Sequence, residues 1–334
     1  MQSYIFTPGA GVDGLKLREH DTPEPRAHEV LVRVRATSLN YRDLPMLSGQ
    51  YGPPTPRVPL SDGSGEVAAV GESVTRFKPG DRVAGAFFPR WIAGRVTTEA
   101  IAMQPSATHD GWLTEYKIFD EDGLVRIPDT LSFEEASALP CAAVTAWSAL
   151  TSFRPLLAGE TVLTQGSGGV SVFALQFARA MGAHIIATTS DEAKAERLRA
   201  LGADVTLNYR ADPDWPTAAK HASGGRGADH IIEVGGPGTL EISIRAAAVG
   251  AQINLIGVLA PRDKGMDPSI LSRNIVSIYR STVGNRADFE AMNRAIDARG
   301  IKPVIDSIFP FADARAAFRH FESRTHFGKV VIGH

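Results

Sequence analysis

The pattern of apolar and polar residues changes character part-way along the chain. In the first 126 residues the apolar side chains come in short bursts, and residues 29–37 alternate apolar with charged positions, as a strand with one solvated face does. Residues 65–71 and 81–86 look like further short strands closed by glycines, while four prolines within 53–59 prevent regular structure there. We therefore predict a β-rich domain with many turns.

From about residue 131 strand-like and helix-like segments alternate. Ser132 and Glu135 have the spacing of a capping box, which predicts that a helix begins there. Alternation of strands with helices is typical of βαβ units and a mostly parallel sheet. The predicted strands are 160–165, 184–188, 205–207, 230–234, 252–256 and 275–279, and the predicted helices are 169–181, 191–201 and 286–300. A last strand over 329–332 is expected to return to the first domain.

Composition narrows the class of protein. A length of 334 residues suits two domains of about 150 residues each. The 35 basic and 37 acidic residues balance, which argues against binding to nucleic acid or to an anionic membrane. One cysteine, Cys141, excludes an internal disulfide framework and a zinc site built from several thiolates. No signal peptide is visible and the longest apolar stretch is too short to span a bilayer, so we expect a cytoplasmic protein.

A glycine-rich run lies between the first predicted strand of the second domain and its helix. Gly166 suits a tight turn, Gly168 lets the backbone approach a pyrophosphate, and the small Ser171 lets the helix pack close to the sheet. The start of the helix offers free N–H groups to phosphate oxygens. The sequence therefore predicts a dinucleotide site in a doubly wound parallel sheet, with Gly166 and Gly168 beside the pyrophosphate.

The end of the next strand bears on which dinucleotide is bound. A site for NAD(H) usually has an acidic residue there that binds the ribose hydroxyls. Here the strand ends in Thr189 and Ser190, and Lys194 follows, a set that suits the 2′-phosphate of NADP(H). Two alternatives stay open: Asp191 turns back to the ribose, or Lys194 is an ordinary solvated helix residue. We predict NADPH, with NADH as the alternative.

Several sequence blocks, taken together in their order and spacing, resemble the medium-chain dehydrogenase/reductase superfamily over nearly the whole chain. The resemblance is strongest to the zinc-independent quinone oxidoreductase branch, which includes zeta-crystallin. The blocks are residues 38–43, 48–51, 58–67, 70–71, 78–83, the glycine-rich run and 200–204. This resemblance implies a GroES-like domain (1–126 and 286–334), a Rossmann domain (127–285), and an active site in the cleft between them.

The family's zinc-dependent members bind their catalytic metal through two cysteines and a histidine. The matching positions here hold Asn40, Ser61 and Cys141, and the four-cysteine lobe for structural zinc is missing. An amide and a hydroxyl are poor substitutes for imidazole and thiolate. We expect no metal, and we expect Cys141 to be a packing residue rather than a catalytic thiol.

Without a Lewis acid, hydride transfer to a quinone or an enone is easier to support than oxidation of an alcohol. The charge that develops spreads over an enolate or hydroquinone, which hydrogen-bond donors can stabilise. By resemblance, Asn40 orients the nicotinamide or polarises the substrate oxygen, and Tyr51 gives a proton or lines the pocket. Asp43 positions Arg42 or a backbone N–H group. The predicted catalytic residues are Asn40, Tyr41, Asp43 and Tyr51, with packing as the alternative for both tyrosines.

The resemblance also implies coenzyme contacts along the rest of the Rossmann domain. Thr145 is expected near the nicotinamide, and Ser190, Lys194 and Tyr209 near the adenosine phosphate. It places Gly168, Gly169 and Val170 on the pyrophosphate. Further contacts are expected from Ser167, Thr189, Gly235, Gly236, Ile256, Gly257, Val258, Ser281, Thr282 and Val283. For the residues in turns, ordinary turn chemistry at strand ends is the alternative. Residues 327–329 loosely resemble a family element that returns to the cleft.

Two other functions and two structural questions remain open at this point. The chain is alternatively a zinc-free alcohol or aldehyde oxidoreductase, or a non-catalytic NADPH-binding protein like the crystallins. Phe88 and Trp91 lie in a long segment without periodicity, and they either shape a substrate mouth or simply pack. The strand over 275–279 is predicted to end its sheet, which favours a homodimer through that edge.

Overall fold

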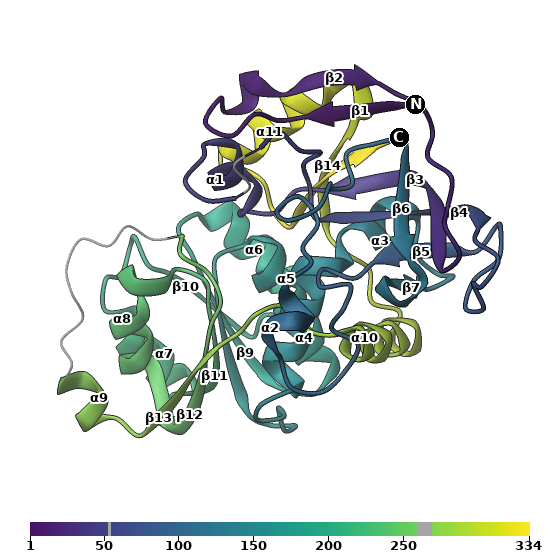
Figure 1. Ribbon diagram of the computed structural model, residues 1–334. Coiled ribbons are helices and arrows are strands. Elements are labelled where there is room, and N and C mark those ends of the chain that lie inside the picture. The colour runs from purple at the N-terminus through teal and green to yellow at the C-terminus, as the bar shows by residue number, and fades with distance from the viewer. Residues whose placement is uncertain (53–54, 260–268) are drawn as a thin grey trace. The chain divides into compact units, whose positions relative to one another are not determined.

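The chain forms two compact units, seen in a computed structural model that describes residues 1–52, 55–259 and 269–334 (Figure 1). Unit one is Met1–Val144 with Gly284–His334, and unit two is Thr145–Val283. The sequence analysis predicts domain boundaries between residues 126 and 127 and between residues 285 and 286. The segment 127–144 belongs with unit one because its helix α3 (Phe133–Ser137) is bonded to that unit's sheet. The hydroxyl of Ser38 donates to the carbonyl of Ser137 at 2.9 Å.

Unit one is built on a seven-stranded sheet in the order β14-β15-β3-β4-β5-β7, with β6 also paired to β3. The last strand, β15, pairs antiparallel with β3, and Val331 lies opposite Ser38. This confirms the predicted return of the chain end to the first domain. The strands are β3 (Glu29–Ser38), β4 (Asp62–Val70), β5 (Arg82–Gly85), β6 (Tyr116–Asp120), β7 (Leu124–Arg126), β14 (Ile305–Pro310) and β15 (Lys329–Gly333). An antiparallel pair, β1 (Gln2–Ile5) and β2 (Lys16–Glu19), stands apart from this sheet.

One tryptophan fills the centre of this sheet's core. Trp112 is fully buried, and a Cβ added at Gly63 or Gly85 would lie only 2.5 or 2.3 Å from its ring. These two strand glycines are therefore required by the close approach of the indole. Phe88 and Trp91 are also buried, with ring centroids 6.1 Å apart, so they pack against each other rather than form an exposed mouth. The helices of unit one are α1 (Asp43–Leu47), α2 (Thr98–Ile101), α3, α10 (Arg286–Arg299) and α11 (Ala314–Glu322).

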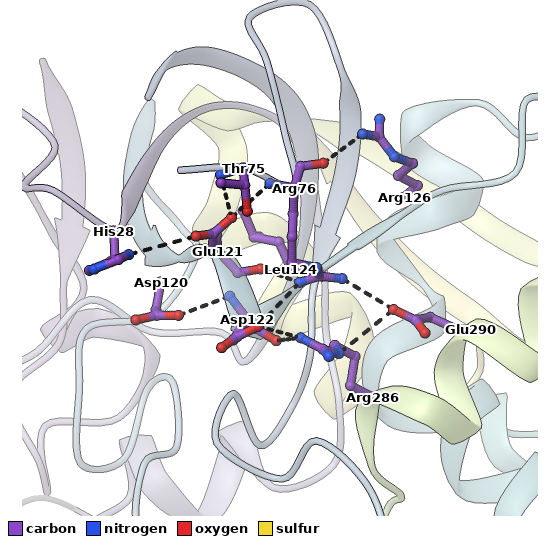
Figure 2. A network of polar contacts seen from close by, with 10 residues as sticks. All are labelled: His28, Thr75, Arg76, Asp120, Glu121, Asp122, Leu124, Arg126, Arg286 and Glu290. Atoms are coloured by element: carbon purple, nitrogen blue, oxygen red, sulfur yellow. Dashed lines mark hydrogen bonds and ion pairs between the residues drawn. The ribbon is translucent and has the colours of Figure 1, made fainter. Parts of the chain in front are cut away.

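A polar network joins α10 to the strands of unit one (Figure 2). The buried carboxylate of Glu121 accepts the backbone N–H groups of Thr75 and Arg76 at 2.9 and 2.8 Å. The guanidinium of Arg76 in turn pairs with Glu290 of α10 at 3.2 Å. The other members are His28, Asp120, Asp122, Leu124, Arg126 and Arg286. The network fixes the first turns of α10, just after the chain returns from unit two.

Unit two is a six-stranded, fully parallel sheet in the order β10-β9-β8-β11-β12-β13. The strand order reverses between β8 and β11, which is the doubly wound arrangement that the sequence predicted. The strands are β8 (Thr161–Gln165), β9 (His184–Thr189), β10 (Val205–Asn208), β11 (Ala228–Glu233), β12 (Ala247–Leu255) and β13 (Val276–Arg280).

Helices cover both faces of the sheet in unit two (Figure 1). Ile253 of β12 packs in one core cluster with residues of α7 and α8, among them Ile244. Gln252 points to the opposite face by strand alternation and donates to the carbonyl of Ala149 in α4. The helices are α4 (Val144–Thr151), α5 (Gly169–Ala180), α6 (Glu192–Ala200), α7 (Trp215–Ala222), α8 (Leu240–Ala246) and α9 (Ser269–Arg273). No helix among the described residues has the length and apolar character that a bilayer span requires.

We predict that Glu121→Ala lowers the free energy of unfolding by about 1–3 kcal/mol at neutral pH, because two part-buried N–H groups lose a charged acceptor. Burial alone would raise the pKa of Glu121, but hydrogen bonds from Arg76 and Thr75 outweigh it and lower the pKa. The stabilisation is therefore full above the unfolded pKa of about 4.3 and disappears as the pH falls through the lower folded value. Urea titrations of wild type, Glu121→Ala and the acceptor-retaining Glu121→Gln measure this. A difference that stays constant through the acidic range contradicts it.

Candidate coenzyme and catalytic sites

The predicted coenzyme residues of unit two gather at one edge of its sheet. Because all six strands run parallel, their carboxyl ends meet at the same edge, and ligands of such sheets bind beside the point where strand order reverses. Each strand is followed there by predicted residues: Gly166–Val170 after β8, Thr189 and Ser190 at the end of β9, Tyr209 after β10, Gly235 and Gly236 after β11, Ile256–Val258 after β12, and Ser281–Val283 after β13.

The loop after β8 has the space and the donors that a pyrophosphate needs. Gly166 has a φ of 71°, and its N–H donates to the carbonyl of Thr188 at 2.7 Å. A Cβ built on Gly166 or Gly168 meets no atom within 4 Å, and Gly168 caps α5 without a side-chain hydrogen bond. Ser171 is buried, and its hydroxyl donates to the carbonyl of Gln165 at 2.6 Å. The first N–H groups of α5 therefore face open space beside the strand end, which fits a dinucleotide phosphate.

The residues predicted for the adenosine phosphate lie together at the ends of β9 and β10. The N–H group of Tyr209 donates to the carbonyl of Thr189 at 3.0 Å, which joins the two strand ends. Asp191 caps α6, and its carboxylate accepts the N–H group of Lys194 at 2.9 Å. The carboxylate that offered an alternative ribose contact is thus engaged in the helix cap. Lys194 and Ser190 are half-buried, and Tyr209 is 42% exposed.

The glycines after β11 have a local structural reason. The N–H groups of Gly235 and Gly236 donate to Glu233 at 2.8 and 2.9 Å, and the Thr239 hydroxyl donates to the same oxygen at 2.6 Å. A Cβ on Gly236 would lie 2.5 Å from the carbonyl of Gly257, so two loops approach backbone to backbone. Turn chemistry therefore explains these glycines. The sequence reasoning missed Glu233, which is a fully buried carboxylate held by neutral donors.

The remaining predicted coenzyme residues differ in accessibility. Thr145 and Ser281 are each 3% exposed, whereas Val258 is 60% exposed. Val283 has a φ of 48°, which is rare for a β-branched residue, and its carbonyl accepts a hydrogen bond from Ser148. Ser167 is buried. Half-buried residues are Gly169, Val170, Ile256, Gly257, Thr282 and Val283. Val258 and the half-buried residues present surface to a ligand, while Thr145 and Ser281 present little.

In unit one the predicted catalytic residues meet a buried polar cluster just after β3. Asn40 is 8% exposed, and its backbone N–H donates to Asp43 at 2.7 Å. Its side-chain oxygen accepts a hydrogen bond from the ammonium of Lys329 at 2.7 Å, and its side-chain nitrogen lies 3.4 Å from the hydroxyl of Ser61. Lys329 is 2% exposed. It came into the sequence reasoning only within a loosely matching element, without a role.

Two carboxylates share this cluster with the lysine. Asp62 accepts the Ser61 hydroxyl at 2.7 Å and the N–H group of Cys141 at 3.0 Å. Burial raises the pKa of Asp62, and it raises the pKa of Asp43 to about 7 against the opposing effect of the Arg42 guanidinium. Burial also lowers the pKa of Lys329. The cluster therefore balances one cation against carboxyl groups whose negative charge burial disfavours.

The two tyrosines differ in their surroundings. The hydroxyl of Tyr51 donates to the carbonyl of Arg42 at 3.2 Å, and the side chain is 49% exposed. Desolvation raises the pKa of Tyr51 to about 12, with Arg42 opposing the shift, so the hydroxyl keeps its proton at neutral pH. Tyr41 is half-buried, and its ring lies 5.8 Å from the guanidinium carbon of Arg324. The Tyr51 hydroxyl is thus an exposed donor whose proton is held by a backbone carbonyl in this structure, whereas Tyr41 makes a cation–π contact with Arg324.

The donor set of this cluster fits a zinc ion poorly. The three positions that match family metal ligands offer an amide from Asn40, a hydroxyl from Ser61 and a thiol from Cys141. Burial raises the pKa of that thiol, which disfavours the thiolate that binds zinc. The ammonium of Lys329 already occupies the amide oxygen. Within the described part of the chain, no three His, Cys, Asp or Glu side chains gather as a metal site.

Comparison with known proteins agrees with this arrangement of two units. Residues 26–129 match the family model described as alcohol dehydrogenase GroES-like domain, and residues 169–298 match that of zinc-binding dehydrogenase. A quinone oxidoreductase of Pseudomonas aeruginosa is 31% identical over 98% of this chain and 98% of its own length. The chain belongs to the medium-chain dehydrogenase/reductase superfamily, in its quinone oxidoreductase-like branch.

Other relatives carry different names. A zinc-type alcohol dehydrogenase-like protein of Schizosaccharomyces pombe is 41% identical over 97% of this chain and 96% of its own length. A putative alcohol dehydrogenase from Sinorhizobium meliloti 1021 has a solved structure with a TM-score of 0.91 and 40% identity over the full length of both chains. A mycobacterial protein solved in complex with NADPH has a TM-score of 0.85 and 26% identity, and covers both chains fully.

As a member of this superfamily, the chain is an NAD(P)-dependent oxidoreductase with a Rossmann-like and a GroES-like part. The fold class and the family predicted from the sequence are thereby confirmed. The roles of individual residues stay predictions.

We predict that Cys141 reacts slowly with Ellman's reagent in the folded protein. Desolvation, with the nearby Asp62 carboxylate, raises the pKa of its thiol above the usual range, and the thiolate is the reactive form. The rate at pH 7 is expected to rise about 100-fold or more in urea. Because the chain has one cysteine, the absorbance change reports this residue alone. Fast stoichiometric labelling of the native protein contradicts the assignment to packing.

Proposed function

We propose that the protein transfers a hydride from NADPH to a quinone or to an activated C=C bond of an enone, without a metal. The observation that carries the proposal is the Asn40 cluster, where an amide (Asn40) and a hydroxyl (Ser61) stand at positions matching metal ligands and the buried ammonium of Lys329 lies beside them. Relatives named quinone oxidoreductase support the substrate class, including one from Homo sapiens at 30% identity over 96% of this chain and 94% of its own length.

The coenzyme supplies the hydride when it is bound, and the chain's own residues bind, orient and supply donors. The open loop at Gly166 and Gly168 and the start of α5 hold the pyrophosphate. The amide of Asn40 and the hydroxyl of Tyr51 offer hydrogen bonds to an oxygen on which negative charge develops. An enolate or a hydroquinone spreads this charge, so neutral donors suffice where a localised alkoxide would call for a metal.

A second candidate is a metal-free alcohol or aldehyde oxidoreductase, favoured by the names of the relatives at 41% and 40% identity. One assay panel with NADPH separates the two: 9,10-phenanthrenequinone, enones and aldehydes are each tested for NADPH consumption. We expect turnover of a quinone or an enone well above that of aldehydes. Preference for aldehydes supports the second candidate, and NADPH binding without any turnover contradicts both.

The preference for NADPH over NADH follows from the ends of β9 and β10. Ser190 and Lys194, both half-buried, present a hydroxyl and a cation, and Asp191 is used as a helix cap. The Thr189 hydroxyl is 2% exposed and bonds to the backbone of Asp191. A 2′-phosphate gains charge-assisted hydrogen bonds from such a set.

We predict that Lys194→Ala raises the Kd for NADPH about tenfold and leaves the Kd for NADH unchanged. The tenfold change corresponds to the loss of one charge-assisted hydrogen bond worth about 1.5 kcal/mol. Fluorescence titration with each coenzyme measures both constants. Lys220→Ala, in α7 of the same unit, is the matched control and is expected to change neither. Equal weakening of both coenzymes, or equal affinities in the wild type, argues against a phosphate site here.

We predict that Tyr51→Phe lowers kcat for the quinone or enone about 100-fold if its hydroxyl is the proton donor, with the KM for NADPH unchanged. The raised pKa keeps this proton in place across neutral pH, so the donor is not limited by its own ionisation there. Steady-state kinetics of Tyr51→Phe are compared with those of Tyr116→Phe, a change in β6 of the same unit. An unchanged kcat removes Tyr51 from the chemistry.

We also propose a homodimer through the edge of the sheet in unit two. Strand β13 ends the sheet among the described residues, and Ile275 and Ile278 beside it are 73% and 37% exposed. An open edge with apolar side chains suits pairing with a second copy. Light scattering after gel filtration is expected to give about twice 35.7 kDa. A monomer mass at micromolar concentration overturns this.

A further inference from the structure

The side chain of Glu233 organises the loop that leaves β11. Glu233 is the last residue of this strand, and it is fully buried. One oxygen of its carboxylate accepts the N–H groups of Gly235 and Gly236 at 2.8 and 2.9 Å. The same oxygen accepts the hydroxyl of Thr239, the residue before α8, at 2.6 Å. The turn after β11 is therefore folded round the carboxylate, and each of these donors is neutral.

The other carboxylate oxygen is bonded to Gln165, the last residue of the neighbouring strand β8. One end of the Gln165 amide lies 3.2 and 3.4 Å from the N–H groups of Val234 and Gly235, so this end is the oxygen. The nitrogen at the other end donates to Glu233 at 2.9 Å and to the hydroxyl of Ser243 at 2.7 Å. That hydroxyl donates in turn to Glu233. All these donors point toward the carboxylate, which fits its ionised form.

The two residues stand where the strand order of the sheet reverses, since β8 and β11 are neighbours there. Gln165 leads directly into the turn at Gly166. The backbone carbonyl of Glu233 accepts the N–H groups of Ile256 and Gly257, in the loop after β12, at 2.8 and 3.3 Å. The contacts of Gln165 and Glu233 therefore join the loops that follow β8, β11 and β12, and coenzyme contacts are predicted for all three loops.

We propose that Gln165 and Glu233 are positioning residues for the coenzyme: they clamp the ends of β8 and β11 together and so set the spacing of the loops that bind the dinucleotide. A ligand in the crevice at a strand-order reversal meets loops from both halves of the sheet, so their separation decides how well the backbone N–H groups reach it. The clamp acts without touching the adenosine phosphate, and NADPH and NADH should therefore depend on it equally. This inference rests on the proposed function for the ligand, but the direction of the hydrogen bonds is a property of the chain alone.

The variant Glu233→Gln keeps the size of the side chain and replaces one acceptor oxygen by an N–H2 group. In one orientation this group faces the amide nitrogen of Gln165, and in the other it faces the N–H groups of Gly235 and Gly236. Rotation of the Gln165 amide does not relieve the conflict, because its other end faces backbone N–H groups. The exchange variant, Gln165→Glu with Glu233→Gln, puts the carboxylate on β8 and the amide on β11, so that an N–H group again points to an oxygen at each contact.

Glu160→Gln is the matched control in the same unit. Glu160 directly precedes β8, at the end of the strand opposite to Gln165. Its carboxylate accepts the N–H group of Leu157 at 2.9 Å and pairs with Arg154. The same change of residue there removes a carboxylate from the far edge of the sheet and leaves the clamp intact.

The first readout needs no coenzyme and is the midpoint of unfolding in urea. We expect Glu233→Gln and Gln165→Glu each to unfold at a lower urea concentration than the wild type, because each sets like groups against one another. The exchange variant is expected to unfold at a higher concentration than both single variants, since the two changes compensate. An exchange variant that does not exceed both overturns the clamp, whether or not the protein binds a coenzyme.

The second readout is the Kd for each coenzyme, measured by fluorescence titration of the folded proteins. We expect Glu233→Gln to raise the Kd for NADPH and for NADH by the same factor, about tenfold or more, as displaced binding groups do. The exchange variant is expected to return both constants to within about threefold of the wild type, and Glu160→Gln to change neither. Wild-type affinities in a folded Glu233→Gln, or a rise for one coenzyme alone, overturn the positioning role.

A milder variant covers the case in which Glu233→Gln does not fold. Ser243→Ala removes one hydroxyl donor from the carboxylate and leaves the backbone contacts in place. It is expected to raise both constants about threefold, and unchanged constants then overturn the positioning role. A wild type that binds neither coenzyme refutes the proposed function, and the unfolding midpoints still decide whether the clamp exists.

Discussion

A parallel sheet carries the carboxyl ends of all its strands to one edge, and the coenzyme site of unit two depends on this constraint. The loops that leave this edge come from segments spread over more than a hundred residues of sequence, yet they share one boundary of the sheet. The turn at Gly166 then frees the start of α5 to face that boundary. In the proposed site, backbone dipoles and N–H groups at the start of α5 are the groups that would hold the pyrophosphate.

Unit one holds charged side chains inside a β-rich core. Lys329 and Asp62 are almost fully buried, and such groups are tolerated only when hydrogen bonds satisfy them. The amide of Asn40 and the hydroxyl of Ser61 connect the two charges. The same positions match those that hold a metal elsewhere in the superfamily. In the proposed function, a buried ammonium and neutral donors would place positive potential near the reacting oxygen in the absence of a metal.

Local patterns predicted local features well. The capping box at Ser132 and Glu135 is present, and the predicted strand over 184–188 corresponds to β9. Alternating strands and helices gave the parallel sheet, because periodicity reports which face of each element is buried. The glycine run correctly marked a turn between a strand and a helix, since a positive φ at Gly166 needs a residue without Cβ.

These local patterns did not predict contacts between residues that are distant in the sequence. Glu233 reads as an ordinary polar residue in sequence, and only the folded loops show five neutral donors around it. Lys329 looks like a solvated strand residue until β15 pairs with β3. Phe88 and Trp91 had no periodicity to reveal that they are buried. In each case the burial of a side chain depends on partners far along the chain, which a single sequence does not name.

The proposed NADPH site lies at the loop following β8 of unit two. Titration calorimetry of the full chain with NADPH, set against the variant Gly168→Val, tests it most directly. A Cβ at position 168 meets no protein atom within 4 Å, so we expect a larger side chain there to leave the fold intact while it obstructs the pyrophosphate. We expect one NADPH per chain for the wild type and binding weakened about tenfold or more in the variant. Equal binding by both proteins, or no binding by the wild type, contradicts it.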